Sequence, residues 1–432
     1  MAQLLIEGGT RLVGRVPISG SKNAVLPILA ACLLTEEECR IKNVPRIEDV
    51  TTMTRLLEAM GVHTRWLDPQ QLQVSAERLA RSEVLAAMAN RMRASFLLMG
   101  PLLARRGEAR VAKPGGDDIG MRRVEQHIVG LRLMGARVEL EGHEYVARAD
   151  RLKGATIHLD MPTVTGTENL MMAAATADGI TTIHNAAREP HVVDLAFFLG
   201  KMGARIQGIG TDVLQIEGVP ELSGATHRVI PDNIEAGTYA IAIAATGGEA
   251  VLEDVVTADL RALILKLRAA GVEVEDQTHS LWVQGNTQVQ SVDVTTWPHP
   301  GFPTDLQAPW VSLMTQADGR THVSEAVFEN RFQHVPELRK LGAEIEVEGR
   351  SAIVSGPSRL HGGTVTVPDI RSGAALVVAA LCASGTTTLD NIYHLDRGYQ
   401  DIVIKLEHLG AHITRVEGQT DVRPDLSRVV GD

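Results

Sequence analysis

The chain has 432 residues, of which 44% are hydrophobic and 22% are charged, and its formal net charge at pH 7 is −11. A chain of this length is too long to fold around one ordinary hydrophobic core, so two domains are expected. The excess of acidic residues argues against nucleic acid or an anionic membrane surface as a partner. The aromatic content of 3% also leaves little side-chain surface on which single-stranded nucleic acid could stack.

Cysteine usage and hydropathy indicate the compartment. Cys32, Cys39 and Cys382 show no CxxC spacing, which predicts free thiols in a reducing compartment without a structural disulfide or zinc ion. The N-terminus has no basic stretch followed by an apolar one, and the longest apolar run, residues 374–383, is too short to cross a membrane. We therefore expect a cytoplasmic protein with no membrane partner.

A short amphipathic segment that ends in Gly-Ala or Gly-Val recurs along the whole chain. Its six glycines are Gly61, Gly135, Gly203, Gly271, Gly342 and Gly410. A glycine that directly follows the last periodic residue is the usual left-handed cap of a helix. The glycines are 68 to 74 residues apart, and so regular a period predicts one supersecondary unit repeated six times.

The other elements recur in the same order within each copy. Each copy begins with a helix rich in Ala and Gly, a composition that suits close packing inside a domain. These helices are expected at residues 23–34, 95–104, 168–177, 235–246, 305–317 and 372–383. A strand, a loop, the amphipathic helix and two alternating strands follow, as in the fifth copy at residues 320–323, 325–333, 335–341, 344–348 and 352–355. The pattern predicts a βαβαββ unit.

Basic side chains gather at two places in these units, at the start of the small-residue helix and in the loop before the amphipathic helix. A helix N-terminus offers free N–H groups and a partial positive charge, and Lys or Arg strengthens its attraction for anions. The residues concerned are Lys22, Arg93, Arg122, Arg331, Arg371 and Arg397. In an acidic chain they predict a site for a small substrate with several negative charges. For any one of them, a helix cap or a surface charge is the alternative interpretation.

Two further segments carry candidate chemistry. Residues 113–123 surround Asp117 and Asp118 with glycines, which predicts either a mobile loop that approaches a ligand or an acidic surface turn. Asp305 follows prolines in the run 298–305, which predicts either a fixed general base or a helix N-cap. The glycine loop lacks the Lys-Ser/Thr ending of a P-loop, no GxGxxG follows a strand, and the histidines show no metal-binding spacing. We therefore expect no cofactor and no metal.

Several motifs together resemble the family of UDP-N-acetylglucosamine 1-carboxyvinyltransferases over residues 5–417. They are SGSKNAVLP from Ser19, MRAS from Met92, PGG from Pro114, NAAREP from Asn185, PHPGFPTD from Pro298, FENRFQHVPEL from Phe328 and YHLDRGY from Tyr393. The Ser-Lys-Asn at residues 21–23 differs from the Ser-Lys-Ser type of the related enolpyruvylshikimate-phosphate synthases, which favours the nucleotide-sugar enzymes. The resemblance implies a two-domain inverted α/β barrel (alpha/beta prism) of six βαβαββ repeats, three per domain. It places one domain at residues 22–229, the other at 1–21 plus 230–432, and the active site in a cleft between them.

The resemblance also implies a reaction in which the enolpyruvyl group of phosphoenolpyruvate moves to the 3-hydroxyl of UDP-N-acetylglucosamine and phosphate is released. The residues implied to hold phosphoenolpyruvate are Lys22, Asn23, Arg122, Arg331 and Arg397. Those implied to hold the nucleotide-sugar are Asn23, Arg93, Arg122, Arg123, Val124, Glu125, Gln126, Thr163, Val164, Thr165, Asp305 and Val327. Asp305 would take the hydroxyl proton, Lys22 and Arg397 would assist catalysis, Asp369 and Arg371 would line the cleft, and the loop around Asp117 would close as a lid.

The chain departs from the family at the lid, where Asp117 stands in place of a cysteine. That cysteine donates a proton to the methylene carbon of phosphoenolpyruvate and is the target of fosfomycin. A carboxylic acid can donate the same proton if its pKa is raised, as burial beside Asp118 would do. The departure predicts retained activity and insensitivity to fosfomycin.

Smaller departures at Arg123, Thr165-Gly166 and Asn233 leave two alternatives open. One is an enolpyruvyl transferase with another acceptor, such as shikimate 3-phosphate or a different nucleotide-sugar. The other is a catalytically silent binding protein that kept the fold.

Overall fold

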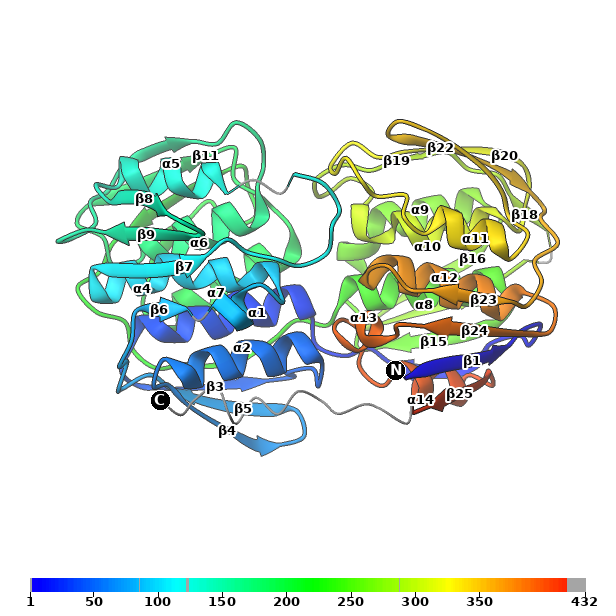
Figure 1. The fold of residues 1–432 in the computed structure, drawn as a ribbon, viewed down its shortest axis with the longest axis horizontal. Coiled ribbons are helices and arrows are strands. Elements are labelled where there is room, and N and C mark those ends of the chain that lie inside the picture. The colour runs from blue at the N-terminus through cyan, green and yellow to red at the C-terminus, as the bar shows by residue number, and fades with distance from the viewer. Residues whose placement is uncertain (1, 85, 122–123, 287, 418–432) are drawn as a thin grey trace. The chain divides into compact units, whose positions relative to one another are not determined.

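A computed structural model describes residues 2–84, 86–121, 124–286 and 288–417. The chain forms two compact units (Figure 1). The terminal unit comprises Met1–Ser19, Asp118–Met121 and Pro231–Asp432, and the inserted unit comprises Gly20–Asp117 and Arg122–Ile230. The predicted boundaries place residues 118–121 in the other domain, at 22–229. They are grouped with the terminal unit because residues of that unit hold their carbonyl groups, as described below.

In the described part of the chain, the strands form six sheets that share one pattern. An edge strand runs parallel to its neighbour, and two antiparallel strands follow. In spatial order, the first sheet of the inserted unit contains β14 (Thr226–Arg228), β3 (Glu38–Lys42), β5 (Gln71–Ser75) and β4 (His63–Asp68). The second contains β6 (Glu83–Val84), β7 (Glu108–Ala112), β9 (Glu144–Arg148) and β8 (Arg137–Glu141). The third contains β10 (Thr156–His158), β11 (Ile180–His184), β13 (Val213–Glu217) and β12 (Arg205–Gln207). The predicted βαβαββ unit is thereby confirmed.

The terminal unit repeats this pattern, and in its fifth-copy sheet the edge strand is split in two. Its sheets are β2 (Val13–Pro17), β15 (Glu249–Glu253), β17 (Ser280–Gln284), β16 (Glu273–Gln277); β18 (Val289–Gln290) with β19 (Val294–Thr295), β20 (Ala317–Ser324), β22 (Ser351–Gly356), β21 (Glu344–Glu348); and β23 (Thr364–Thr366), β24 (Thr386–Asp390), β1 (Gln3–Glu7), β25 (His412–Val416).

The N-terminal segment completes two copies whose other strands lie far along the chain. β1 lies antiparallel between β24 and β25, where Leu4 stands opposite Leu389 and Arg415 (Figure 1). β2 pairs in parallel with β15, where Val16 stands opposite Leu252. The sixth copy therefore takes its last strand, and the fourth its first, from the start of the chain.

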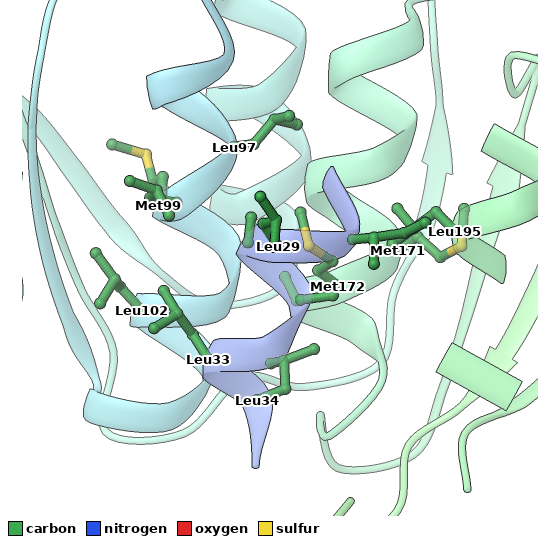
Figure 2. Close-up of a cluster of buried hydrophobic side chains, with 14 of the residues drawn as sticks. Leu29, Leu33, Leu34, Leu97, Met99, Leu102, Met171, Met172 and Leu195 are labelled. Atoms are coloured by element: carbon green, nitrogen blue, oxygen red, sulfur yellow. The ribbon is translucent and has the colours of Figure 1, made fainter. Parts of the chain in front are cut away.

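The small-residue helices form the interior of each unit, and their residues are almost all buried. They are α1 (Lys22–Ala31) with η1 (Cys32–Leu34), η2 (Arg93–Leu98) with α4 (Met99–Arg106), α6 (Val164–Ala174), α8 (Asn233–Ala245), η4 (Thr304–Leu306) with α10 (Gln307–Met314), and α12 (Ile370–Cys382). Figure 2 shows leucine and methionine side chains of α1, η1, α4 and α6 meeting in the core of the inserted unit, with Leu195 beside them. Burial of one such side chain stabilises a fold by about 1.5–3 kcal/mol.

Small residues let these helices approach closely. A Cβ atom on Gly100 of α4 would lie 2.3 Å from Asn169 Oδ1 of α6, a distance that real contacts do not allow. The fifth of these helices ends earlier than predicted, at Met314 rather than Ala317. The reason is that Ala317 already pairs with Val289 in the sheet, while the carbonyl of Thr315 accepts the N–H of Ser358.

The six repeated glycines adopt the expected left-handed conformation, with φ between 85° and 107°. Each stands close after the end of an amphipathic helix and just before a strand. These helices are α2 (Glu48–Ala59), α5 (Glu125–Leu133), α7 (Pro190–Lys201), α9 (Arg261–Ala269), α11 (Val335–Lys340) and α14 (Ile402–His408). Short turns complete the elements: α3 (Ala86–Ala89), η3 (Thr257–Leu260) and α13 (Tyr393–Asp396). The glycine period thus marks the end of the second helix in every copy.

Each unit has its own hydrophobic core, one built from residues 24–229 and the other from residues 2–18 and 234–413. Cys32, Cys39 and Cys382 are free thiols, as expected from their spacing. Within the described ranges, no helix is long and apolar enough to span a membrane.

Candidate functional site

Asp305 of η4 lies between two arginines of the terminal unit. Arg371 donates from Nε to Oδ2 at 3.0 Å and places Nη2 2.8 Å from the same oxygen, while Arg331 Nη2 donates to Oδ1. The arginine side chains are 4–5% exposed and the aspartate side chain is 23% exposed. Asp305 caps no helix, because α10 has no side-chain cap. The arrangement instead fixes an ionised carboxylate in one orientation.

A buried hydroxyl pair supports Arg371 from behind. Arg371 Nη1 donates to Tyr399 Oη at 3.2 Å, and that oxygen lies 3.0 Å from Thr238 Oγ1. Burial alone would lower the pKa of Arg371, but its electrostatic interactions with Asp305, Tyr399 and Asp232 together with the hydrogen bond to Tyr399 outweigh burial, and the pKa is raised. Burial raises the pKa of Tyr399, so its hydroxyl stays protonated. Arg371 is therefore a permanent cation whose direction is set by two elements.

The remaining predicted residues of the terminal unit have separate positions. Asp369 is the N-cap of α12 and accepts the N–H groups of Arg371 and Ser372 at 2.9 and 3.0 Å. Arg397 is buried at the end of α13. The N–H of Val327 donates to Glu325 at 2.8 Å. The cap interpretation thus applies to Asp369, while Asp305 and Arg331 meet directly.

The residues after Asp117 are fastened to the loop that carries Arg331. Asn330 N–H donates to the carbonyl of Ile119 at 3.1 Å, and Asn330 Nδ2 donates to the carbonyl of Asp118 at 3.1 Å. Gln333 also donates to the carbonyl of Asp118. Ile119 is buried, while Asp117 is half-buried. The predicted lid segment is therefore held by its backbone.

In the inserted unit, Lys22 and Asn23 stand at the start of α1, where Ser21 caps the helix through a 3.3 Å bond from Ala24 N–H. Lys22 Nζ lies 3.1 Å from Asp49 of α2, and the lysine side chain is 13% exposed. A lysine at a helix N-terminus has the charge that an anion requires. Asp49 had no part in the sequence prediction.

Residues 124–126 and 163–165 come together in the inserted unit. Gln126 accepts the N–H of Asp160 at 2.8 Å and so connects α5 to the turn before α6. Val124 is buried before α5, Glu125 is exposed, and Thr163 caps α6 through a 3.3 Å bond from Gly166 N–H. Val164 and Thr165 form the first residues of α6. Arg93 stands at the start of η2.

His127 is buried beneath these residues. Asn169 accepts the N–H of Gly100 through Oδ1, so its Nδ2 faces His127 Nδ1 at 3.0 Å. Because Nδ2 only donates, His127 Nδ1 must accept, and Nε2 carries the proton toward Thr165 Oγ1 at 3.2 Å. Burial and the charge of Arg93 lower the pKa of His127 to about 3. His127 is therefore a neutral residue that orients Thr165.

Two predicted ligands, Arg122 and Arg123, lie outside the described residues. The structure brings Asp305, Arg331 and Arg371 together in the terminal unit, and it brings Gln126 to the turn before α6 in the inserted unit. Lys22, Asn23 and Arg93 stand on other helices of the inserted unit. The cleft between the two domains stays a prediction. Within the described ranges, no three His, Cys, Asp or Glu side chains gather as metal ligands would.

Comparison with known proteins decides the family. The model of EPSP synthase (3-phosphoshikimate 1-carboxyvinyltransferase) matches residues 6–406. The chain belongs to this family. A UDP-N-acetylglucosamine 1-carboxyvinyltransferase 2 of Carboxydothermus hydrogenoformans is 49% identical over 420 residues, which are 96% of this chain and 100% of the relative. A UDP-N-acetylglucosamine 1-carboxyvinyltransferase of Granulibacter bethesdensis is also 49% identical, over 97% of this chain and 100% of the relative.

A solved structure supports the fold of this family member. The enolpyruvyl transferase NikO from Streptomyces tendae superposes with a TM-score of 0.87 at 29% identity, covering 96% of this chain and 99% of that chain. The predicted resemblance and fold class, a two-domain inverted α/β barrel, are confirmed by these matches.

Tyr399, Asp49 and Glu325 contact predicted site residues but were not predicted themselves. Tyr399 stood inside a motif used for the resemblance, so its position next to the candidate Arg397 was a usable signal. Asp49 and Glu325 had no such signal, because acidic residues near helix starts and strand ends are common.

Proposed function

We propose that this family member transfers the enolpyruvyl group of phosphoenolpyruvate to the 3-hydroxyl of UDP-N-acetylglucosamine and releases phosphate. The observation that carries the proposal is the 49% identity, over nearly the whole chain, to relatives named for this transfer. The proposed place of the reaction is the first committed step of peptidoglycan synthesis, as in the family that the motifs resemble. The cytoplasmic location stays a prediction.

The first half of the proposed reaction is an addition. The 3-hydroxyl oxygen attacks C2 of phosphoenolpyruvate while Asp305 accepts the hydroxyl proton and Asp117 gives a proton to C3, which becomes a methyl group. Two positively charged arginines hold Asp305 in one orientation, which supports its role as a base at a defined place. Lys22 and the buried Arg397 supply cations for the phosphate or carboxylate of phosphoenolpyruvate.

Arg331 has two parts in this proposal, because it is both a partner of Asp305 and a ligand of phosphoenolpyruvate. An incoming phosphate or carboxylate competes with Asp305 for the same guanidinium. As Arg331 turns to the substrate, Oδ1 of Asp305 becomes available to the sugar hydroxyl, while Arg371 keeps Oδ2 in place. Binding of phosphoenolpyruvate thereby makes one oxygen of the base available to the sugar hydroxyl.

The second half is an elimination. The C2–O bond to phosphate breaks, and the phosphate takes up the proton that Asp305 accepted in the first step. The Asp117 carboxylate takes one proton back from C3, and the C2–C3 double bond forms again. Atoms and charges balance without an oxidant or reductant. The products are the enolpyruvyl nucleotide-sugar and phosphate, and the step regenerates the Asp117 acid and the Asp305 carboxylate.

A phosphate-release assay tests the proposal directly. Purified chain is mixed with phosphoenolpyruvate and, in separate reactions, UDP-N-acetylglucosamine, shikimate 3-phosphate or UDP-glucose. We expect phosphate release only in the reaction whose acceptor is UDP-N-acetylglucosamine. Release only with shikimate 3-phosphate would replace the proposed acceptor, and release with none would favour a silent binding protein.

A further inference from the structure

Glu325 has a buried carboxylate that accepts hydrogen bonds from three separate segments of the terminal unit. It follows the last residue of β20 and is 3% exposed. Oε1 accepts the Thr296 hydroxyl at 2.7 Å and the N–H groups of Val327 and Phe328 at 2.8 and 3.0 Å. Oε2 accepts the Thr304 hydroxyl at 2.9 Å. Both carboxylate oxygens are thus engaged, as a buried charge requires.

The Thr304 bond leads directly to Asp305. Thr304 precedes Asp305 in η4, and its hydroxyl gives its only proton to Glu325. The same oxygen therefore accepts from Arg331 Nε at 3.2 Å, and Arg331 Nη2 donates to Asp305. Glu325 consequently sets the direction of the Thr304 hydroxyl, and that hydroxyl sets the position of the Arg331 guanidinium.

The main chain of Glu325 is itself fixed. Its N–H donates to the carbonyl of Arg350 at 2.8 Å, and Arg350 Nε donates back to the Glu325 carbonyl at 2.9 Å. The Thr296 hydroxyl accepts the N–H of Ala326 at 2.9 Å. A carboxylate that stabilised only its own turn would need no hydrogen bonds beyond those from the N–H groups of residues 327 and 328. The bonds to Thr296 and Thr304 span 29 and 21 residues and join the turn to the segment before Asp305.

We propose that Glu325 is a positioning residue for the transfer reaction, which holds Asp305 through Thr304 and Arg331 and holds the Val327 loop through two N–H groups. The inference rests on the proposed function. The two carboxylate oxygens should have separate effects on the reaction. Oε2 holds the candidate base, and Oε1 holds the loop whose Val327 the family resemblance assigns to the nucleotide-sugar.

The test uses Thr304→Val, Thr304→Ser and Glu325→Gln in the full chain. Valine keeps the shape of threonine but removes the hydroxyl, whereas serine keeps it. We expect Thr304→Val to lower kcat at least tenfold with less than a threefold change in the KM for UDP-N-acetylglucosamine. Thr304→Ser should restore kcat to within threefold of the unchanged chain. Glu325→Gln, which disturbs both oxygens, should lower kcat and raise that KM together.

Thr246→Val is the matched control, because the Thr246 hydroxyl also donates and accepts, to Ala242 at 2.9 Å and from Leu12 N–H at 3.4 Å, at the far end of α8. It should lower Tm without changing kcat. The inference is overturned if Thr304→Val keeps kcat within twofold, if serine fails to rescue, or if Thr246→Val lowers kcat equally. If Thr304→Val does not fold, Glu325→Gln decides by whether kcat and KM change together. If the proposed function is wrong, the chain without substitutions releases no phosphate with UDP-N-acetylglucosamine, which distinguishes that failure from failure of the inference about Glu325.

Discussion

Arg371 contacts one oxygen of Asp305 with two nitrogens, Nε at 3.0 Å and Nη2 at 2.8 Å, while its third nitrogen donates to Tyr399. A single guanidinium therefore connects the candidate base to a buried hydroxyl. The planar fork of arginine makes this possible, and the single nitrogen of lysine does not reproduce it.

Replacing Arg371 by lysine should accordingly weaken catalysis more than folding. One ammonium reaches either Asp305 or Tyr399, so Asp305 loses its second fixed partner. We expect kcat/KM in the phosphate-release assay to fall about 100-fold, which corresponds to roughly 2.7 kcal/mol of transition-state stabilisation. Arg339→Lys is the control, because Nε and Nη2 of Arg339 both donate to the carbonyl of Ile345. It should lower Tm only, and an equal loss of activity in both variants would contradict the interpretation.

Asp117→Asn tests the proton donor. Asparagine has no acidic proton to give to C3, so turnover should fall by at least about 100-fold, the usual contribution of a general acid. Asp118→Asn is the neighbouring control, because Asp118 is exposed and accepts hydrogen bonds from Asn330 and Gln333 through its backbone carbonyl. It should lower turnover by less than about tenfold, because it removes only the neighbouring charge that helps to raise the pKa of Asp117 and leaves the donor in place.

Asp117→Cys should recover turnover and gain a thiol that fosfomycin modifies. Intact mass measurement would then find the adduct on this variant and none on the unchanged chain. Full turnover by Asp117→Asn, or covalent fosfomycin on the unchanged chain, would refute the assignment.

Local patterns were enough to predict the repeated unit but not the partners of Asp305. The glycine after each amphipathic helix adopts positive φ in all six copies, because the cap geometry depends on neighbouring residues alone. In contrast, the arginines on Asp305 come from 26 and 66 residues away, and Asn330 reaches Asp118 across 212 residues. Neither hydrophobic periodicity nor helix-cap rules relate residues that are so far apart in the sequence. The family resemblance marked Asp305, Arg331 and Arg371 as site residues, but it did not indicate that these side chains pair with one another.

Alanine should have opposite effects at Gly100, which lies where α4 contacts α6, and at Gly200 of α7. A Cβ atom at Gly100 would lie 2.3 Å from Asn169 Oδ1 and 2.4 Å from its carbonyl oxygen, so Gly100→Ala must push the helices apart. We expect it to cost about 1–3 kcal/mol or more of unfolding free energy. Gly200 lies in α7 with no atom within 4 Å of such a Cβ. Gly200→Ala should therefore stabilise the chain by up to about 1 kcal/mol, through helix propensity. Urea unfolding of both variants checks the signs, and destabilisation by both would argue against close packing as the cause.

The buried His127 should make folding sensitive to acid. Burial and the charge of Arg93 lower its pKa from 6.5 to about 3 in the folded chain. Below pH 6.5 the unfolded chain takes up a proton that the folded chain refuses, so the stability is present above pH 6.5 and is lost as the pH falls toward 3. At pH 5 the loss is about 2 kcal/mol, at 1.36 kcal/mol per pH unit. Burial also lowers the pKa of His334, to about 4, which acts with the same sign.

His127→Gln isolates this contribution, because glutamine does not titrate. The variant should be less stable than the unchanged chain at pH 7.5, where it loses the bonds to Thr165 and Asn169. Between pH 7.5 and pH 5, however, its unfolding free energy should fall by about 2 kcal/mol less than that of the unchanged chain. Urea titrations at the two pH values measure both differences. Equal pH slopes in the two proteins would mean that His127 is protonated in the folded chain, and the direction assigned to its hydrogen bond with Asn169 would then have to be reversed.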